Sequence, residues 1–146
     1  MVKMEDGLLK ELLNVEDSIE LKVRFNDIDA MGTVHFKKYL EYFDDGFVSF
    51  MNNIQDPLAL ENALKSGIVF PVKKINIQYE LSAEFGEHVI VKTRIKNIRE
   101  TSISFFHEIY RETDNALLAK VVCDRHVMNL KSKSLVNVKQ FFSKFV

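Results

Sequence analysis

Residues that cross-link or interrupt a chain are scarce in this sequence. Its 146 residues include one cysteine, two prolines, five glycines and no tryptophan. Cys123 has no second cysteine with which to form an internal disulfide, which fits a reducing compartment. The scarcity of proline and glycine predicts few, short loops and no flexible linker. We therefore expect a single domain over residues 1–146.

Charge of one sign and long apolar runs are also missing. Lys and Arg number 20 and Asp and Glu number 21, a net charge of -1. A protein that neutralises many phosphates usually carries a basic excess, so we expect no nucleic-acid partner. No apolar run approaches the roughly 18 residues that suggest a membrane span. We expect a soluble, cytoplasmic protein that does not associate with membranes.

The two parts of the chain differ in charge. Residues 1–60 contain 12 acidic and 6 basic residues, whereas residues 61–146 contain 9 acidic and 14 basic residues. Lysine-rich strand faces in contact with water would explain the difference. A binding site for an anionic ligand, such as a phosphorylated cofactor, would explain it equally.

Hydrophobic periodicity predicts the element order. Apolar residues recur every three or four positions from Phe36 to Ile54, which predicts a long helix with a wide apolar stripe, capped by Thr33. Shorter helices are expected at residues 7–13, 56–65 and 138–146. Alternation of apolar and polar residues predicts strands at 19–25, 74–81, 89–96, 103–110 and 117–130.

One antiparallel sheet curved around the long helix satisfies both the wide apolar stripe and the short connections between strands. The fold class is therefore expected to be α+β, with five strands wrapped around one central helix. The sheet would keep open edges, so pairing with a second copy of the chain is expected.

Residues 24–35, between the first strand and the long helix, contain the most informative motif. Asp27, Asp29 and His35 stand together before a helix N-terminus, whose unpaired N–H groups could hold a developing oxyanion. A carboxylate here could attack an acyl carbon or activate water. Two aspartates before a helix are also typical of turns and caps.

The motif resembles that of a known family. Asp27-Ile28-Asp29-Ala30-Met31-Gly32, followed by Val34, Tyr39-Leu40 and Tyr42-Phe43-Asp44, is similar to the signature of the 4-hydroxybenzoyl-CoA thioesterase family of hotdog-fold proteins. The resemblance implies a hotdog fold and hydrolysis of an acyl-CoA to a free acid and coenzyme A. It implies no cofactor, because coenzyme A is part of the substrate.

The resemblance also implies roles for individual residues. Asp29 matches the catalytic carboxylate, which acts as nucleophile or as base for water. Phe36 stands where relatives supply the backbone N–H that polarises the thioester carbonyl, and Gly32 matches the glycine that turns the chain toward the helix. Asp27 matches an aspartate that holds the loop by hydrogen bonds. His35 could orient Asp29 or donate to the substrate carbonyl, or it could simply face water.

Lys96 and Arg99 lie at an expected turn between two strands. By resemblance, basic residues in this turn bind the phosphates of coenzyme A, to which they can donate charged hydrogen bonds. An ordinary solvated turn is the other interpretation. The spacing of histidines and Cys123 matches no zinc motif, so we expect no metal.

Three functions remain open at this stage. The first is an acyl-CoA thioesterase whose site forms between subunits of a homodimer or homotetramer. The second is a non-catalytic hotdog module that binds acyl-CoA. The third is a related hotdog enzyme acting on thioesters of acyl carrier protein.

Overall fold

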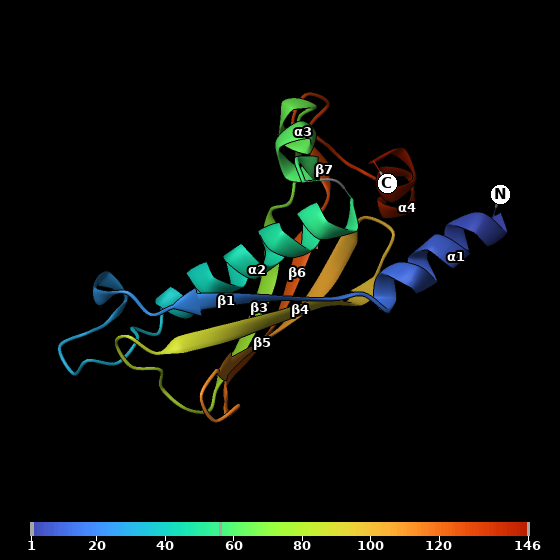
Figure 1. Ribbon diagram of the computed structural model, residues 1–146. Coiled ribbons are helices and arrows are strands. Elements are labelled where there is room, and N and C mark those ends of the chain that lie inside the picture. The colour runs from blue at the N-terminus through green and yellow to red at the C-terminus, as the bar shows by residue number, and fades with distance from the viewer. Residues whose placement is uncertain (1, 56, 146) are drawn as a thin grey trace.

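A five-stranded antiparallel sheet with one long helix across its face forms the centre of the computed structural model, which describes residues 2–55 and 57–145 (Figure 1). In order across the sheet, the strands are β1 (Glu16–Lys22), β4 (His88–Ile98), β5 (Ser102–Arg111), β6 (Leu117–His126) and β3 (Val72–Tyr79). The helix is α2 (Lys38–Ile54), so the α+β prediction of five strands around one helix is confirmed.

Alternation along the strands separates a buried face of the sheet from an outer face. On β5, Ile103, Phe105 and Ile109 are fully buried beneath α2, while Phe106 and Tyr110, each next to one of these residues, are only half-buried. The apolar stripe of α2 covers this buried face. Removing both apolar surfaces from water is the main favourable contribution to this packing.

Three further helices and a small second sheet extend the core beyond the C-terminal end of α2. The helices are α1 (Val2–Leu13), α3 (Ala59–Lys65) and α4 (Val138–Phe145). The small sheet joins β2 (Ile68–Val69), β7 (Met128–Asn129) and β8 (Ser134–Leu135). Phe141 and Phe142 of α4 are buried in the same cluster as Phe50 of α2. None of the helices in the described ranges is long and apolar enough to cross a membrane.

The small sheet is the main departure from the expected elements. A single strand was expected over 117–130, but the chain leaves the large sheet after His126. The backbone N–H of His126 donates to Pro71 and that of Val127 to Thr101, and Met128 then pairs with Val69 of β2. These non-local partners are set by tertiary packing, which short-range alternation does not reveal.

The long helix also begins later than expected. Its first residue is Lys38, and Thr33 does not cap it, so that prediction was wrong. Thr33 instead forms a bridge with Glu84, and residues 28–34 form a small hairpin through pairing of Ile28 with Val34. The backbone N–H groups of Val34 and His35 donate to the Ala83 and Asp27 carbonyls, so the helix does not begin there. The short helix expected at 56–65 begins at Ala59, and its expected cap at position 56 lies outside the described residues.

Close approach between α2 and the sheet depends on Gly46. A Cβ at this position would lie 2.6 Å from Thr93 Oγ1 and 2.9 Å from Val91 Cγ1. Real Cβ atoms do not come so near, so any side chain here would push the helix away from β4.

Candidate active site

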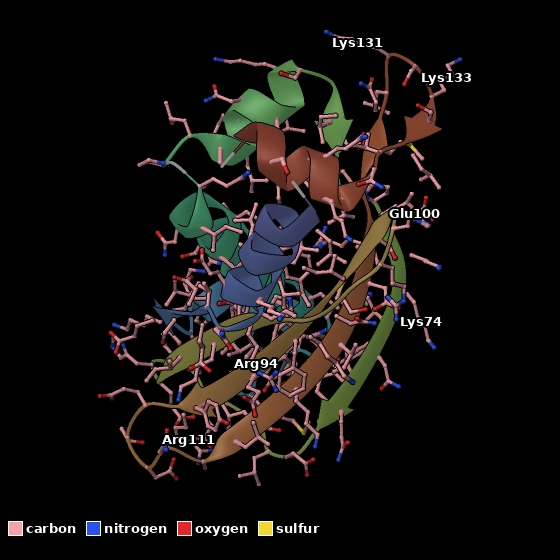
Figure 2. The ribbon with its side chains drawn as sticks, turned by 90° about the vertical axis from the view of Figure 1, so that its right-hand side faces the viewer. Lys74, Arg94, Glu100, Arg111, Lys131 and Lys133 are labelled. Atoms are coloured by element: carbon pink, nitrogen blue, oxygen red, sulfur yellow. The ribbon has the colours of Figure 1, made fainter. Side chains whose placement is uncertain are left out.

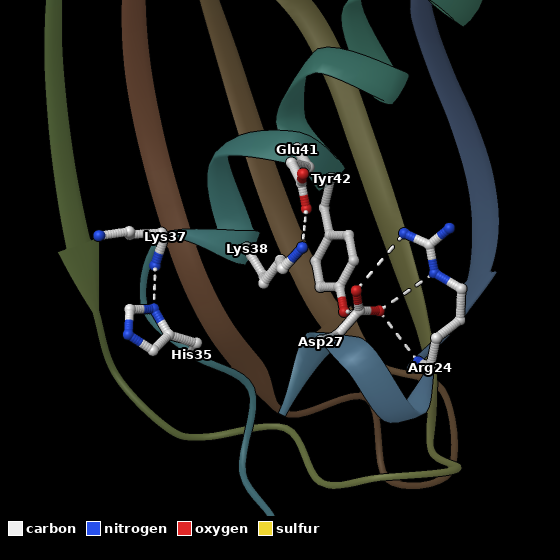
Figure 3. Close-up of polar contacts among 7 residues, drawn as sticks. All are labelled: Arg24, Asp27, His35, Lys37, Lys38, Glu41 and Tyr42. Atoms are coloured by element: carbon white, nitrogen blue, oxygen red, sulfur yellow. Dashed lines mark hydrogen bonds and ion pairs between the residues drawn. The ribbon is translucent and has the colours of Figure 1, made fainter. Parts of the chain in front are cut away.

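Asp27 is the best-connected acidic residue of the loop before α2 (Figure 3). Its carboxylate is fully buried and accepts hydrogen bonds from the Arg24 backbone N–H at 2.9 Å and from the Tyr42 hydroxyl at 2.8 Å. The Arg24 guanidinium lies 3.4 Å away. Burial alone raises the pKa of Asp27, but the bonds from Arg24 and Tyr42 outweigh it and hold the pKa below its usual value. A carboxylate that is charged at neutral pH therefore ties the loop to α2.

Asp29 lies in a different environment, in the turn of the 28–34 hairpin. Its carboxylate accepts a hydrogen bond from the Met31 N–H at 2.8 Å and a longer one from the Thr33 hydroxyl at 3.3 Å. Gly32 follows with φ +82, a conformation that favours glycine and lets the chain reverse. Asp29 is only half-buried, so its oxygens keep the capacity to accept further hydrogen bonds.

His35 and Phe36 connect the hairpin to α2. The His35 Nδ1 accepts a hydrogen bond from the Lys37 N–H at 3.3 Å (Figure 3). The His35 ring stacks on the ring of Phe36, with 4.8 Å between the ring centroids. Among the described residues, no hydrogen bond joins Asp29 to either of them. The site residues therefore lie on one short segment without direct contact between the carboxylate and the histidine.

The backbone of Phe36 has the property expected of an oxyanion donor. Its N–H has no acceptor within the described part of the chain, whereas its carbonyl accepts a hydrogen bond from the Tyr79 hydroxyl at 3.1 Å. A cavity of about 260 Å³ lies here, lined by Phe36, Tyr39, Tyr79 and Leu81 among others. Phe36 precedes the first residue of α2 by two positions, so its N–H lies just before the helix and not within its first turn.

Lys96 and Arg99 lie beside another cavity, of about 280 Å³. The Arg99 guanidinium donates to the Ser104 hydroxyl at 2.7 Å, which in turn donates to Asp124 at 2.5 Å. Lys74, on the edge strand β3, lines the same cavity and was missed by the sequence analysis (Figure 2). Alternation along β3 could have identified it, because it places Lys74 on the polar face of that strand.

The two groups of expected site residues lie at opposite ends of the sheet (Figure 1). β4 begins at His88, paired with Lys22 next to the aspartate loop, and ends at Ile98, next to Arg99. Its 11 residues span roughly 30 Å at the usual strand rise. One copy of the chain therefore does not bring Lys96 and Arg99 to the Phe36 N–H.

The sheet order, the single helix across the sheet and the aspartate loop before it define a hotdog-fold protein. The model of the thioesterase-like superfamily matches residues 23–146, so the chain belongs to that superfamily. The match includes the aspartate loop, α2 and the four strands β3 to β6.

Individual relatives agree with this assignment. The Bacillus subtilis protein YneP is 28% identical over 91 residues, which cover 62% of this chain and 64% of YneP. The acyl-CoA thioesterase YbgC of Haemophilus influenzae is 27% identical over 99 residues, covering 66% of this chain and 70% of YbgC. A solved structure of the Synechocystis 1,4-dihydroxy-2-naphthoyl-CoA thioesterase superimposes with a TM-score of 0.79 at 20% identity, covering 89% of this chain and 94% of that one. The last likeness establishes the fold.

Proposed function

We propose that this protein is an acyl-CoA thioesterase that hydrolyses its substrate to a carboxylic acid and free coenzyme A. The observation that carries the proposal is the unpaired Phe36 N–H, which lies beside a cavity on the segment that also contains Asp29. Membership of the thioesterase-like superfamily and the activity in the name of YbgC support it.

In the proposed reaction, the thioester carbonyl oxygen accepts a hydrogen bond from Phe36, which stabilises the negative charge that develops on that oxygen. Asp29 either removes a proton from the attacking water or itself attacks the acyl carbon, and water then hydrolyses the anhydride. The C–S bond breaks, and the departing thiolate of coenzyme A takes up a proton. In this proposal Gly32 shapes the turn, and His35 donates a second hydrogen bond to the carbonyl oxygen.

A homodimer completes the site in this proposal. β3 is an edge strand whose side chains are mostly exposed, including Ile75 and Tyr79. Val72 lies at the end of β3 nearest Arg99, and Tyr79 lies at the end that contacts Phe36. Antiparallel pairing of two β3 strands would place the Val72 end of one copy beside the Tyr79 end of the other.

Such pairing would bring the basic cavity of one copy toward the Phe36 N–H of the other. Lys96 and Arg99 would then bind the phosphates of coenzyme A while the thioester reaches Phe36 in the second subunit. A cytoplasmic location is proposed with this function, since the single cysteine is buried and suits a reducing compartment.

A panel of acyl-CoA thioesters with detection of the released thiol tests the proposal. We expect turnover of at least one acyl-CoA, with the free acid and coenzyme A formed in equal amounts. Matched thioesters of acyl carrier protein form a second arm. Hydrolysis of the carrier-protein thioesters alone would show that the protein is an acyl-acyl-carrier-protein thioesterase. Binding of acyl-CoA without thiol release in either arm would show that it is a non-catalytic module.

A further inference from the structure

His107 is a polar side chain in the middle of the apolar core. Its side chain lies on the helix-facing side of β5, is 1% exposed, and its ring lies 5.5 Å from that of Phe43 on α2. Its Nδ1 is hydrogen-bonded to Thr93 Oγ1 at 2.8 Å. No group among the described residues bonds to its Nε2. An unpaired polar atom in such surroundings is a group that a ligand could satisfy.

This ring borders a cavity of about 200 Å³ between α2 and the edge strand β3. Leu40, Phe43, Ile75 and Cys123 form apolar walls of the cavity. Leu40 lies in the first turn of α2, four residues beyond Phe36, so the cavity begins near the start of the helix that follows the proposed oxyanion donor. An acyl group held by Phe36 can therefore extend along α2 toward His107.

The Thr93 contact determines which hydrogen-bonding group His107 offers. Thr93 is fully buried, and His107 Nδ1 is the one acceptor near its hydroxyl in the described structure. If the Thr93 hydroxyl donates to Nδ1, only one group of this pair lacks a hydrogen-bond partner, the Nε2–H of His107. The opposite tautomer leaves both the Thr93 hydroxyl proton and Nε2 without partners, so the first arrangement is favoured. His107 therefore presents a donor to the cavity.

The charges around the cavity favour a neutral ligand group. Burial, and then the positive charge of Arg125, lower the pKa of His107 to about 3, so its ring is uncharged at neutral pH. Arg125 is already paired with Asp44 at 2.5 Å and bonded to the Phe70 carbonyl at 3.0 Å. The Arg125 charge is thus already balanced by Asp44, although its buried Nε has no partner, so a hydroxyl or keto oxygen suits the neutral donor of His107 better than a carboxylate does.

We propose that His107 is a specificity-determining residue whose Nε2–H donates a hydrogen bond to an oxygen substituent, hydroxyl or keto, on the acyl group of a CoA thioester. The proposal rests on the proposed function for the identity of the ligand. A ligand without the oxygen leaves the donor unpaired, and a site built to hydrogen-bond a substrate oxygen rejects such analogues.

Calorimetry with non-hydrolysable S-alkyl-CoA thioethers tests the proposal without requiring turnover. Each probe with an oxygen at a successive carbon is compared with the unsubstituted chain of equal length. In the unaltered protein, one oxygen position should tighten binding roughly tenfold, as expected for one buried hydrogen bond. In His107→Leu the two probes should bind alike, and His107→Gln, which keeps an amide donor, should restore part of the preference.

Matched variants separate this role from a structural one. Cys123→Ala enlarges the same cavity and should change the affinity for both probes equally. Thr93→Val removes the bond that favours the donor tautomer and should reduce the preference even if His107→Leu fails to fold. If the unaltered protein binds the thioethers equally tightly with and without an oxygen at every position, the inference about His107 is wrong, and the proposed thioesterase function is not affected. A preference abolished in His107→Leu upholds it even without hydrolysis of any thioester, and binding of no thioether overturns both proposals.

Discussion

Asp27 and Asp29 stand two positions apart and have opposite environments. Asp27 is buried and bonded to Arg24 and Tyr42, so its charge is used to hold the loop against α2. Asp29 is half-buried in a turn and keeps lone pairs for a water or a substrate. The difference arises because Asp27 ends the short helical turn Phe25–Asp27, within reach of Tyr42, whereas Asp29 lies in the turn of the 28–34 hairpin.

This contrast predicts different effects of the same substitution at the two aspartates. Asp29→Asn should lower kcat by roughly two to four orders of magnitude, because the base or nucleophile is lost, and change the unfolding free energy by less than about 0.5 kcal/mol. Asp27→Asn should cost about 1.5–3 kcal/mol of stability through loss of charged hydrogen bonds. Assays of kcat and Tm on both variants decide the matter. Near-full activity in Asp29→Asn would mean that Asp29 is not the catalytic carboxylate.

His107 predicts a pH dependence of stability. Its pKa is lowered to about 3 in the folded protein, while an unfolded histidine titrates near 6.5. As the pH falls below about 6.5, the unfolded chain takes up a proton that the folded protein does not, so stability declines until about pH 3. The slope from this group is at most about 1.4 kcal/mol per pH unit. Denaturant midpoints between pH 7 and 4 should fall less steeply in His107→Gln than in the unaltered protein.

At the scale of elements, the contact between α2 and the sheet depends on one small residue. Gly46 lies where a methyl group would collide with Thr93 and Val91. The same contact places Phe43 against His107 and so shapes the cavity between α2 and β3. Glycine at the centre of a helix loses more backbone entropy on folding than other residues do, but here it lets α2 pack closer to β4.

Gly46→Ala tests this packing. The better helix propensity of alanine contributes about 1 kcal/mol, but the collision should cost more, leaving a net loss of roughly 1–2 kcal/mol and a Tm lower by several degrees. Ser49→Ala, a half-buried position on the same helix, is the matched control and should leave Tm nearly unchanged. An unchanged or raised Tm in Gly46→Ala would show that the helix can shift without penalty.

At the scale of the whole molecule, the fold leaves an open sheet edge and splits the proposed site between two ends of the sheet. The edge strand β3 exposes Val72, Ile75 and Tyr79, each more than two-fifths exposed. A dimer through this edge would pair the free backbone groups and cover the apolar side chains. Both the edge and the split site therefore point to the same assembly.

The assembly predicts a stable dimer in solution, by itself or within a larger oligomer. Ile75→Lys places a charge on the proposed interface and should shift the protein toward monomer, with a loss of thioesterase activity to which the cavity wall at Ile75 also contributes. Leu64→Lys on α3, which is 58% exposed, should change neither. Light scattering across a dilution series measures the mass, and an active monomer at low concentration would contradict the dimer.

Binding of the coenzyme A phosphates predicts a separate kinetic effect. The double variant Lys96→Glu, Arg99→Glu should raise KM for acyl-CoA by roughly tenfold or more with a smaller change in kcat, because a phosphate contact is equal in ground and transition states. Its KM for an acyl-pantetheine thioester, which lacks the nucleotide, should stay unchanged. The matched control reverses the charges of Lys131 and Lys133, in the turn between β7 and β8, and should leave KM for acyl-CoA unchanged (Figure 2). An unchanged KM for acyl-CoA in the double variant would place the phosphates elsewhere.

The local pattern of the sequence determined the elements of this protein and its family. β4, β5 and α2 each bury one face, so their apolar residues recur with the period of a strand or a helix. This periodicity can be read from the sequence. The aspartate motif likewise depends on neighbours within a few residues, so it could be recognised directly.

Tertiary structure alone decided the relations between distant segments. Three features depend on which residues meet across the fold. They are the small sheet of β2, β7 and β8, the unpartnered Nε2 of His107 and the separation of Arg99 from Phe36 along the sheet. Alternation along β5 places His107 on the same face as Phe105 and Ile109, but it does not reveal what the two ring nitrogens contact there. Such contacts depend on non-local geometry, which short-range periodicity does not encode.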